Sequence, residues 1–319
     1  MKPGLTIHFF DNAVGERKDK ELLVNLLRDH YHIEVVNELT RRRTNFGPPK
    51  RSDKQIKTKV GISCNVLDTW LHEERYDVNI LLINEEWIAA FNKDVIKTFD
   101  YVIVKSIHAK KILEKYNKNI IVLPFWSIDR YDNNVKVEEK VLHFAGKSIQ
   151  KGTEYIIDIP EVTVHDVTRR FYENENLKCN YSRYYISDDD VNKMFNEHNL
   201  HLCTSLYEGY GHYFYEALFC GKRPIATKLP MWLEFFDDEF VSYLDVEKTN
   251  HHDDFRFFTA DPPDGGWLNR EGYIFNKEQL LEKIQKNKHT KFNIKMRNYI
   301  KELFEKRKLN FLKFIKDVS

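Results

Sequence analysis

The stretch that decides the fold reads Glu208-Gly-Tyr-Gly-His-Tyr-Phe-Tyr-Glu216, followed by Ala-Leu-Phe-Cys-Gly221-Lys-Arg-Pro-Ile-Ala-Thr227. Two glutamates enclose a glycine-bearing turn and the beginning of a helix, and a short apolar strand follows. Gly209 and Gly211 let backbone N–H groups approach a phosphate or a sugar closely, where the helix N-terminus adds positive potential. Carboxylates before the turn and two turns into the helix can accept hydrogen bonds from sugar and ribose hydroxyls. The alternative is an ordinary loop and helix with solvated glutamates.

A second stretch lies upstream and reads Val141-Leu-His-Phe-Ala-Gly146-Lys147-Ser-Ile-Gln-Lys151-Gly152-Thr-Glu-Tyr-Ile-Ile. The pattern predicts a strand, a glycine turn that carries two cations, and then a helix. Two lysines in a loop are usually solvated. Because they precede the paired glutamates in this order, a functional role is the better interpretation.

Together the two stretches resemble the GT-B glycosyltransferases, in particular the retaining family 4 group, in which seven residues separate the two glutamates. In that family the first strand of the donor domain ends in Gly-Arg and continues to Lys-Gly. The resemblance places Lys147 where arginine is usual and Lys151 on the lysine, although a lysine is a point charge and not a bidentate fork. A softer match covers residues 99–129, with Ser127 where the family commonly has glycine.

The resemblance implies an α/β fold of the GT-B type, with two Rossmann-like domains facing a central cleft. We expect residues 1–126 to form the acceptor-side domain and residues 127–299 to form the domain that binds the nucleotide sugar. A C-terminal helix over about 300–319 should cross back to the first domain.

The activity that the resemblance implies is transfer of a sugar from a UDP- or GDP-linked donor to a hydroxyl of a glycan, glycolipid or glycoprotein. Retention of configuration and independence from metals and other cofactors come with it. Glu208 would orient the sugar, Glu216 would hold the ribose, and Lys147 and Lys151 would neutralise the leaving phosphate. The donor-binding set is Gly146, Lys147, Lys151, Tyr185, Ile186, Glu208, Gly209, Tyr210, Gly211 and Glu216. The acceptor-side candidates are Gly15, Glu85 and Arg42.

Two alternatives stay open. A basic segment over residues 41–59, which includes Arg41-Arg42-Arg43, is either a solvated loop or a surface for a polyanion. As a polyanion site it would attract either an anionic membrane that carries a lipid-linked sugar or DNA. If the partner is DNA, the activity would be glycosyl transfer to modified DNA bases. The other alternative is a non-catalytic sugar-nucleotide-binding protein.

Composition narrows the class of protein. The chain has 319 residues and a net charge of +1, so no chain-wide attraction to polyanions is expected. Its four cysteines show no close pairing, which is typical of reduced thiols in the cytoplasm. Since no apolar run approaches the ~20 residues that span a bilayer, attachment to a membrane surface is the most that we expect.

Periodicity predicts the remaining elements. Asp188 should cap a helix over 188–197, which favours capping over metal binding for Asp188-Asp189-Asp190. Gly221 fits the C-terminus of the helix that contains Glu216. A long loop is expected over residues 245–272. The expected strands are 5–10, 33–36, 79–84, 162–166, 182–186 and 200–204, with a helix to about Arg28 after a loop that holds Gly15.

Overall fold

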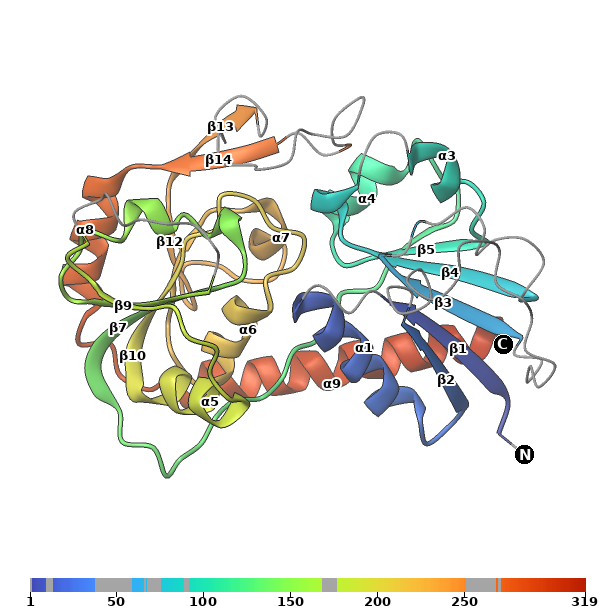
Figure 1. Ribbon diagram of the computed structural model, residues 1–319, viewed down its shortest axis with the longest axis horizontal. Coiled ribbons are helices and arrows are strands. Elements are labelled where there is room, and N and C mark those ends of the chain that lie inside the picture. Colours follow the sequence, from blue (N-terminus) through green and yellow to red (C-terminus); the bar gives the residue numbers. More distant parts are fainter. Residues whose placement is uncertain are drawn as a thin grey trace. The chain divides into compact units, whose positions relative to one another are not determined.

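The computed structural model describes residues 2–9, 14–37, 59–65, 67, 76–88, 92–167, 177–250, 268 and 271–319 (Figure 1). These residues divide into two compact units. Unit 1 contains the described residues of 1–126 together with 268 and 305–319, and unit 2 contains 127–250 and 271–304. The basic segment, including Arg42, lies outside the described residues apart from Lys59.

Unit 1 is built on a parallel sheet of six described strands in the order β2-β1-β3-β4-β5-β6. Its strands are β1 (Gly4–Phe9), β2 (His32–Asn37), β3 (Val60–Cys64), β4 (Val78–Ile83), β5 (Tyr101–Val104) and β6 (Ile120–Val122). Its helices are α1 (Val14–Leu27), α3 (Lys93–Ile96), α4 (Ile107–Leu113) and the 3-10 turn η2 (Glu85–Trp87). Strands buried on both faces need unbroken apolar runs, and Ile80 to Ile83 is such a run.

The C-terminal helix α9 (Ile294–Val318) supplies part of the core of unit 1. Phe311 contacts the rings of Phe125 and Trp126 edge-on, with centroids 6.1 and 5.5 Å away. Arg307 Nη1 donates to the carbonyl of Phe125 at 2.9 Å. The end of the helix therefore belongs to the first unit, although its beginning is grouped with the second.

Unit 2 has a second parallel sheet of six described strands, in the order β12-β11-β10-β7-β8-β9. Its strands are β7 (Glu138–Gly146), β8 (Val162–Asp166), β9 (Asn180–Ser182), β10 (His198–Cys203), β11 (Ile225–Thr227) and β12 (Ser242–Leu244). Its helices are α5 (Asp188–Glu197), α6 (His212–Phe219), α7 (Pro230–Leu233), α8 (Lys277–Asn287) and the first part of α9. The strand order reverses between β7 and β10, and such a switch point is where open α/β sheets bind ligands.

Helix α6 ends as predicted. Gly221 has a φ of +67°, and its N–H bonds the carbonyl of Leu218 at 3.0 Å. The N–H of Lys222 bonds the carbonyl of Ala217 at 3.2 Å. This is the paired hydrogen-bond pattern of a Schellman motif, which needs the left-handed conformation that glycine adopts without strain.

Several sequence expectations were wrong in detail. The cap of α5 is Ser187, whose hydroxyl accepts from Asp190 N, so Asp188 is the first helical residue and not the cap. Residues 149–155 form two 3-10 turns, η4 (Ile149–Lys151) and η5 (Thr153–Tyr155), because Gly152 between them has a φ of +67°. Strand β9 ends at Ser182, so residues 183–186 are not a strand.

Two further corrections concern loops. Gly15 lies in the first turn of α1 and not in the preceding loop. The expected loop over 245–272 has strands at both of its ends, since β13 (Val246–Asn250) pairs antiparallel with β14 (Glu271–Phe275). The residues between these strands, apart from Leu268, lie outside the described part of the chain.

Candidate functional site

The two sequence motifs meet at the switch point of unit 2. Strand β7 ends at Gly146 and β10 ends at Cys203, and the two strands are neighbours in the sheet. The carboxyl ends of parallel strands lie at one edge of the sheet. The loops that carry Lys147 and Lys151 and the loop that carries Glu208 therefore leave the sheet side by side.

Direct hydrogen bonds join these loops. Thr204 Oγ1 donates to the carbonyl of Lys151 at 2.9 Å, and Leu206 N donates to the carbonyl of Gln150 at 2.8 Å. A Cβ at Gly152 would lie 2.6 Å from the carbonyl oxygen of Thr204. Only glycine allows this approach, so the Lys-Gly pair of the sequence has a physical reason here.

Lys151 and Glu208 form a buried ion pair between Nζ and Oε2. Ser205 Oγ donates to the same carboxylate oxygen at 3.0 Å, and the hydroxyl of Tyr213 lies 2.8 Å from Ser205 Oγ. Burial raises the pKa of the Tyr213 phenol well above its ordinary value, with Glu208 adding to the shift, so the phenol keeps its proton. The Lys151 ammonium also lies 4.0 Å from the centroid of the Tyr213 ring.

Lys147 has a different environment from Lys151, although the sequence predicts the same role for both. Its side chain is exposed, and its ammonium lies 4.9 Å from the ring centroid of Tyr185, which is itself 73% exposed. Among the described residues, no carboxylate lies within ion-pair distance of Lys147. Ile186 is half-buried in the same loop.

The glycine turn directs the chain into α6. Gly211 precedes the helix with a φ of +78°, and a Cβ there would lie 2.9 Å from the Trp232 ring and 3.0 Å from Cγ of Glu208. Tyr210 stacks on Tyr215 at 4.4 Å, and its carbonyl accepts from Trp232 Nε1 at 3.0 Å. Gly209 is buried. The turn is thus fixed by aromatic packing, and it presents the N-terminus of α6 beside Glu208.

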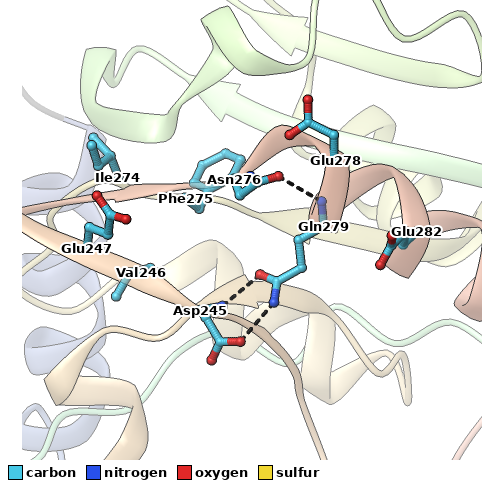
Figure 2. A pocket seen from close by; sticks show the side chains of 9 residues that line it. All are labelled: Asp245, Val246, Glu247, Ile274, Phe275, Asn276, Glu278, Gln279 and Glu282. Carbon is cyan, nitrogen blue, oxygen red and sulfur yellow. Dashed lines mark hydrogen bonds between the residues drawn. The ribbon is translucent and has the colours of Figure 1, made fainter.

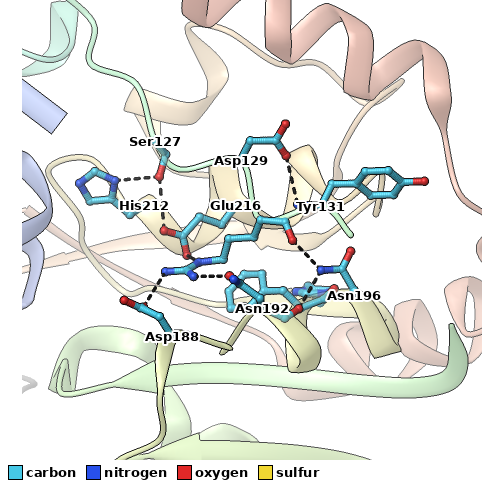
Figure 3. Close-up of polar contacts among 11 residues, drawn as sticks. Ser127, Asp129, Tyr131, Asp188, Asn192, Asn196, His212 and Glu216 are labelled. Carbon is cyan, nitrogen blue, oxygen red and sulfur yellow. Dashed lines mark hydrogen bonds and ion pairs between the residues drawn. The ribbon is translucent and has the colours of Figure 1, made fainter. Parts of the chain in front are cut away.

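Glu216, the second glutamate, is completely buried (Figure 3). Its Oε2 lies 2.9 Å from Nε of Arg130, and its Oε1 accepts from Ser127 Oγ at 3.4 Å. The same hydroxyl lies 2.9 Å from Nδ1 of His212. Both carboxylate oxygens therefore have protein partners in this structure, and the expected contact with a ribose stays a prediction.

Sequence reasoning did not identify the residues around Glu216. Arg130 Nη1 donates to Asn192 Oδ1 at 2.6 Å, and Asn196 Nδ2 donates to the carbonyl of Arg130 at 2.6 Å. Asp129 forms a two-point ion pair with Arg297 of α9, at 2.7 and 2.9 Å. The signal in the sequence was the charged pair Asp129-Arg130, which follows the largely apolar run Pro124-Phe-Trp-Ser-Ile128.

A concave region of unit 2, of about 690 Å³, lies elsewhere (Figure 2). Gln279 contacts both the backbone and the carboxylate of Asp245 in its wall. Four of its lining residues are acidic and none is basic, so a diphosphate would be repelled. The lining residues are Asp245, Val246, Glu247, Ile274, Phe275, Asn276, Glu278, Gln279 and Glu282.

In unit 1, two of the three acceptor-side candidates lie within the described residues. Glu85 is buried in η2 directly after β4, and Gly15 is exposed in α1 with nothing within 4 Å of where a Cβ would be. Arg42 is outside the described residues. Lys105, directly after β5, forms a buried ion pair with Asp19 of α1 at 2.6 Å, and no sequence pattern indicates this pair.

Within the described part of the chain, no group of three or more His, Cys, Asp or Glu side chains is arranged to hold a metal ion. No described helix is both long enough and apolar enough to cross a bilayer.

Comparison with known proteins identifies the fold. No family model and no curated protein matches the sequence. Among solved structures, sucrose-phosphate synthase from Thermosynechococcus elongatus superposes with a TM-score of 0.67 at 14% identity, over 100% of this chain and 99% of that one. Alr3699/HepE from Anabaena, solved in complex with UDP and glucose, superposes with a TM-score of 0.65 at 14% identity. The match covers 99% of this chain and 100% of that one. The chain has the GT-B fold.

A third GT-B neighbour comes from a study of glycosyl transfer with retention by trehalose-6-phosphate synthase. It matches with a TM-score of 0.63 at 7% identity, over 99% of each chain. At such identities the likeness shows the fold, and the prediction of a GT-B fold is confirmed. Activity has to be argued from the site.

Proposed function

We propose that this protein is a glycosyltransferase that moves a sugar from a nucleotide-diphosphate donor to a hydroxyl acceptor, with the donor bound by unit 2. The observation that carries the proposal is the buried Lys151–Glu208 pair at the switch point, next to the N-terminus of α6. It combines a cation, a carboxylate and the N-terminus of a helix, which are the groups that a diphosphate and a sugar need.

Each group has a role in the proposed reaction. As the glycosidic bond breaks, negative charge grows on the β-phosphate, and Lys151, with Lys147 nearby, stabilises that charge. When the Lys151 ammonium turns toward the phosphate, the Glu208 carboxylate is released to accept a hydrogen bond from a sugar hydroxyl. Gly146, Gly209 and Gly211 keep the backbone close to the ligand.

The donor class has support from the neighbours, since HepE was solved with UDP and glucose. We propose retention of configuration, in line with the reaction studied in trehalose-6-phosphate synthase. We also propose that the reaction needs no divalent metal, because lysines provide the phosphate charge. The Tyr185–Ile186 loop, at the carboxyl end of β9, is the proposed contact for the nucleobase.

The test is a panel of UDP- and GDP-linked sugars, scored by thermal stabilisation and by release of free nucleotide. We expect one donor to raise the melting temperature and to be consumed slowly by hydrolysis and faster with an acceptor. Lys151→Met combined with Glu208→Gln removes both charges of the pair and should abolish turnover in a folded protein. Nucleotide binding without any turnover would favour the non-catalytic alternative, and no binding at all would reject the proposal.

A further inference from the structure

The buried ion pair at the switch point is held by a chain of hydrogen bonds that has no role in the reaction proposed above. Lys151 Nζ and Ser205 Oγ both bind Oε2 of Glu208, the hydroxyl at 3.0 Å. Tyr213 reaches the same carboxylate through Ser205, since its hydroxyl lies 2.8 Å from Ser205 Oγ. The four residues are 0–7% exposed. Their contacts therefore replace most of the solvation that water would give the carboxylate.

The chemistry of the groups fixes the direction of these hydrogen bonds. A carboxylate that is paired with an ammonium only accepts, so the 3.0 Å contact uses the single proton of the Ser205 hydroxyl. The 2.8 Å contact must then use the proton of Tyr213. Burial raises the pKa of the Tyr213 phenol well above its ordinary value, so this proton is present at neutral pH. Tyr213 therefore donates to Ser205, and Ser205 donates to Glu208.

The chain leaves one oxygen of Glu208 open. Lys151 and Ser205 both bind Oε2, and no hydrogen bond from the described residues goes to Oε1. The stem of the side chain lies against the glycine turn, where a Cβ at Gly211 would be 3.0 Å from Glu208 Cγ. A buried carboxylate with one oxygen held and the other without a donor is ready to accept a hydrogen bond from a ligand hydroxyl.

We infer that Ser205 and Tyr213 are positioning residues for Glu208, which hold Oε2 in place so that Oε1 accepts the hydrogen bond from a hydroxyl of the donor sugar. The inference deepens the proposed function and rests on it. The chain matters most when Lys151 turns toward the diphosphate, because Glu208 then loses its cation. A buried carboxylate without a partner is strongly unfavourable. Among the described residues the Ser205 hydroxyl, polarised by Tyr213, is then the donor that remains.

Tyr213→Phe isolates the phenol hydroxyl. The Lys151 ammonium lies 4.0 Å from the centroid of the Tyr213 ring, a cation–π contact that phenylalanine keeps. The variant therefore leaves the phosphate side of the ion pair as it is and weakens only the hold on Glu208. The probes are UDP and UDP-glucose, or the nucleotide and nucleotide sugar that the panel above identifies instead. We expect kcat/KM for hydrolysis of UDP-glucose to fall roughly two- to tenfold, as for loss of one neutral hydrogen bond, and the affinity for UDP in calorimetry to stay unchanged.

Ser205→Ala shows whether Tyr213 acts through its neighbour. The variant removes the donor to a charged oxygen, and it should lower kcat/KM roughly ten- to a hundredfold. Adding Tyr213→Phe to Ser205→Ala should lower kcat/KM no further. It should also raise the melting temperature, because Ser205→Ala alone leaves the phenol buried without a partner. A second, independent loss of kcat/KM in the double variant would contradict the inference.

A matched control is Tyr243→Phe. Tyr243 is also buried in unit 2, and its hydroxyl donates to the carbonyl of Phe236 at 3.1 Å, but it lies on β12 outside the candidate site. This variant should bind UDP and hydrolyse UDP-glucose as the wild type does. A decrease of kcat/KM equal to that of Tyr213→Phe would mean that any buried phenol in unit 2 has this effect, and the inference would be wrong.

The outcomes separate the inference from the proposed function. An unchanged kcat/KM in Tyr213→Phe, or a loss of UDP affinity by the same factor as kcat/KM, would overturn the inference and leave the proposed function intact. A wild type that binds no nucleotide and hydrolyses no nucleotide sugar would reject both. If Tyr213→Phe does not fold, its combination with Ser205→Ala takes its place in the same two measurements, because both partners of that hydrogen bond are then apolar.

Discussion

Two histidines in the sheet of unit 2 should make its stability depend strongly on pH. His143 of β7 and His201 of β10 are fully buried, and desolvation lowers the pKa of each to about 3. His143 is held as the neutral form, with Nδ1 3.3 Å from the carbonyl of Leu202 and Nε2 3.0 Å from Thr153 Oγ1. Neither ring belongs to the candidate site, so the effect concerns folding.

The sign follows from proton linkage. In the unfolded chain each imidazole titrates near pH 6.5, whereas in the folded state it titrates near 3. Between these values the unfolded state binds more protons, so the free energy of unfolding decreases as the pH falls. The two neutral histidines make their full contribution to the free energy of unfolding above pH 6.5. From pH 7.5 to 5.0 each histidine should lower the free energy of unfolding by about 2 kcal/mol, and the two together by about 4 kcal/mol.

The perturbation is His143→Gln. A glutamine amide can still donate and accept hydrogen bonds, but it does not titrate. The free energy of opening is measured by hydrogen exchange and mass spectrometry in peptides that cover β7 and β10, corrected for the intrinsic effect of pH. We expect the variant to lose about 2 kcal/mol less than the wild type over the same pH interval. His30→Gln, at an exposed histidine, is the control.

The comparison uses the change with pH and not the absolute stability, because glutamine will not fill the imidazole site perfectly. If His143→Gln and the wild type lose the same free energy between the two pH values, His143 is not the titrating group. A pH dependence that His30→Gln reduces equally would also refute the reasoning, since burial would then be irrelevant.

The remaining predictions concern the candidate site. Lys151→Met alone should destabilise the protein by about 3–5 kcal/mol, because it leaves the buried Glu208 carboxylate unpaired, and adding Glu208→Gln should restore most of the melting temperature without restoring UDP affinity. Turnover should survive EDTA, and its loss with recovery on adding manganese would disprove lysine-based phosphate stabilisation. Gly211→Ala should lower stability by about 1–3 kcal/mol in thermal melts, since a Cβ meets Trp232 at 2.9 Å and the φ is +78°, whereas Gly15→Ala in the open first turn of α1 should not destabilise.

Sequence was sufficient for the features that depend on local chemistry. Apolar runs predicted the central strands, and Gly221 predicted the end of α6 because a left-handed residue has few alternatives to glycine. The resemblance to the family predicted that Lys151 and Glu208 share a site, although they are 57 positions apart in sequence. The structure gives the physical reason, because parallel strands place their carboxyl ends at one edge of the sheet.

Features that depend on tertiary partners could not be predicted. The cap of α5 is a different case, because Ser187 has Asp190 three residues later, at the spacing of a capping box, whereas Asp188 has Val191 there; this local signal was overlooked. Strand β3 is only five residues long and contains Gly61, so it has no clear pattern. Ser127 was noted only as a departure from a glycine, since its partner His212 is 85 residues away in sequence.

The two lysines show why residue type is a weak guide to energetic role. A charge at the exposed Lys147 position is screened by water and salt, and such a charge contributes little to binding on its own. The Lys151 charge is buried, so its field is much less screened, but Glu208 neutralises it until an anion competes. If unit 2 binds a nucleotide sugar as we propose, the diphosphate gains most from Lys151 when a sugar hydroxyl simultaneously takes the place of Lys151 beside Glu208. On that proposal a complete nucleotide sugar satisfies both charges, whereas a free nucleotide satisfies only one, and this asymmetry would favour the donor over the leaving group.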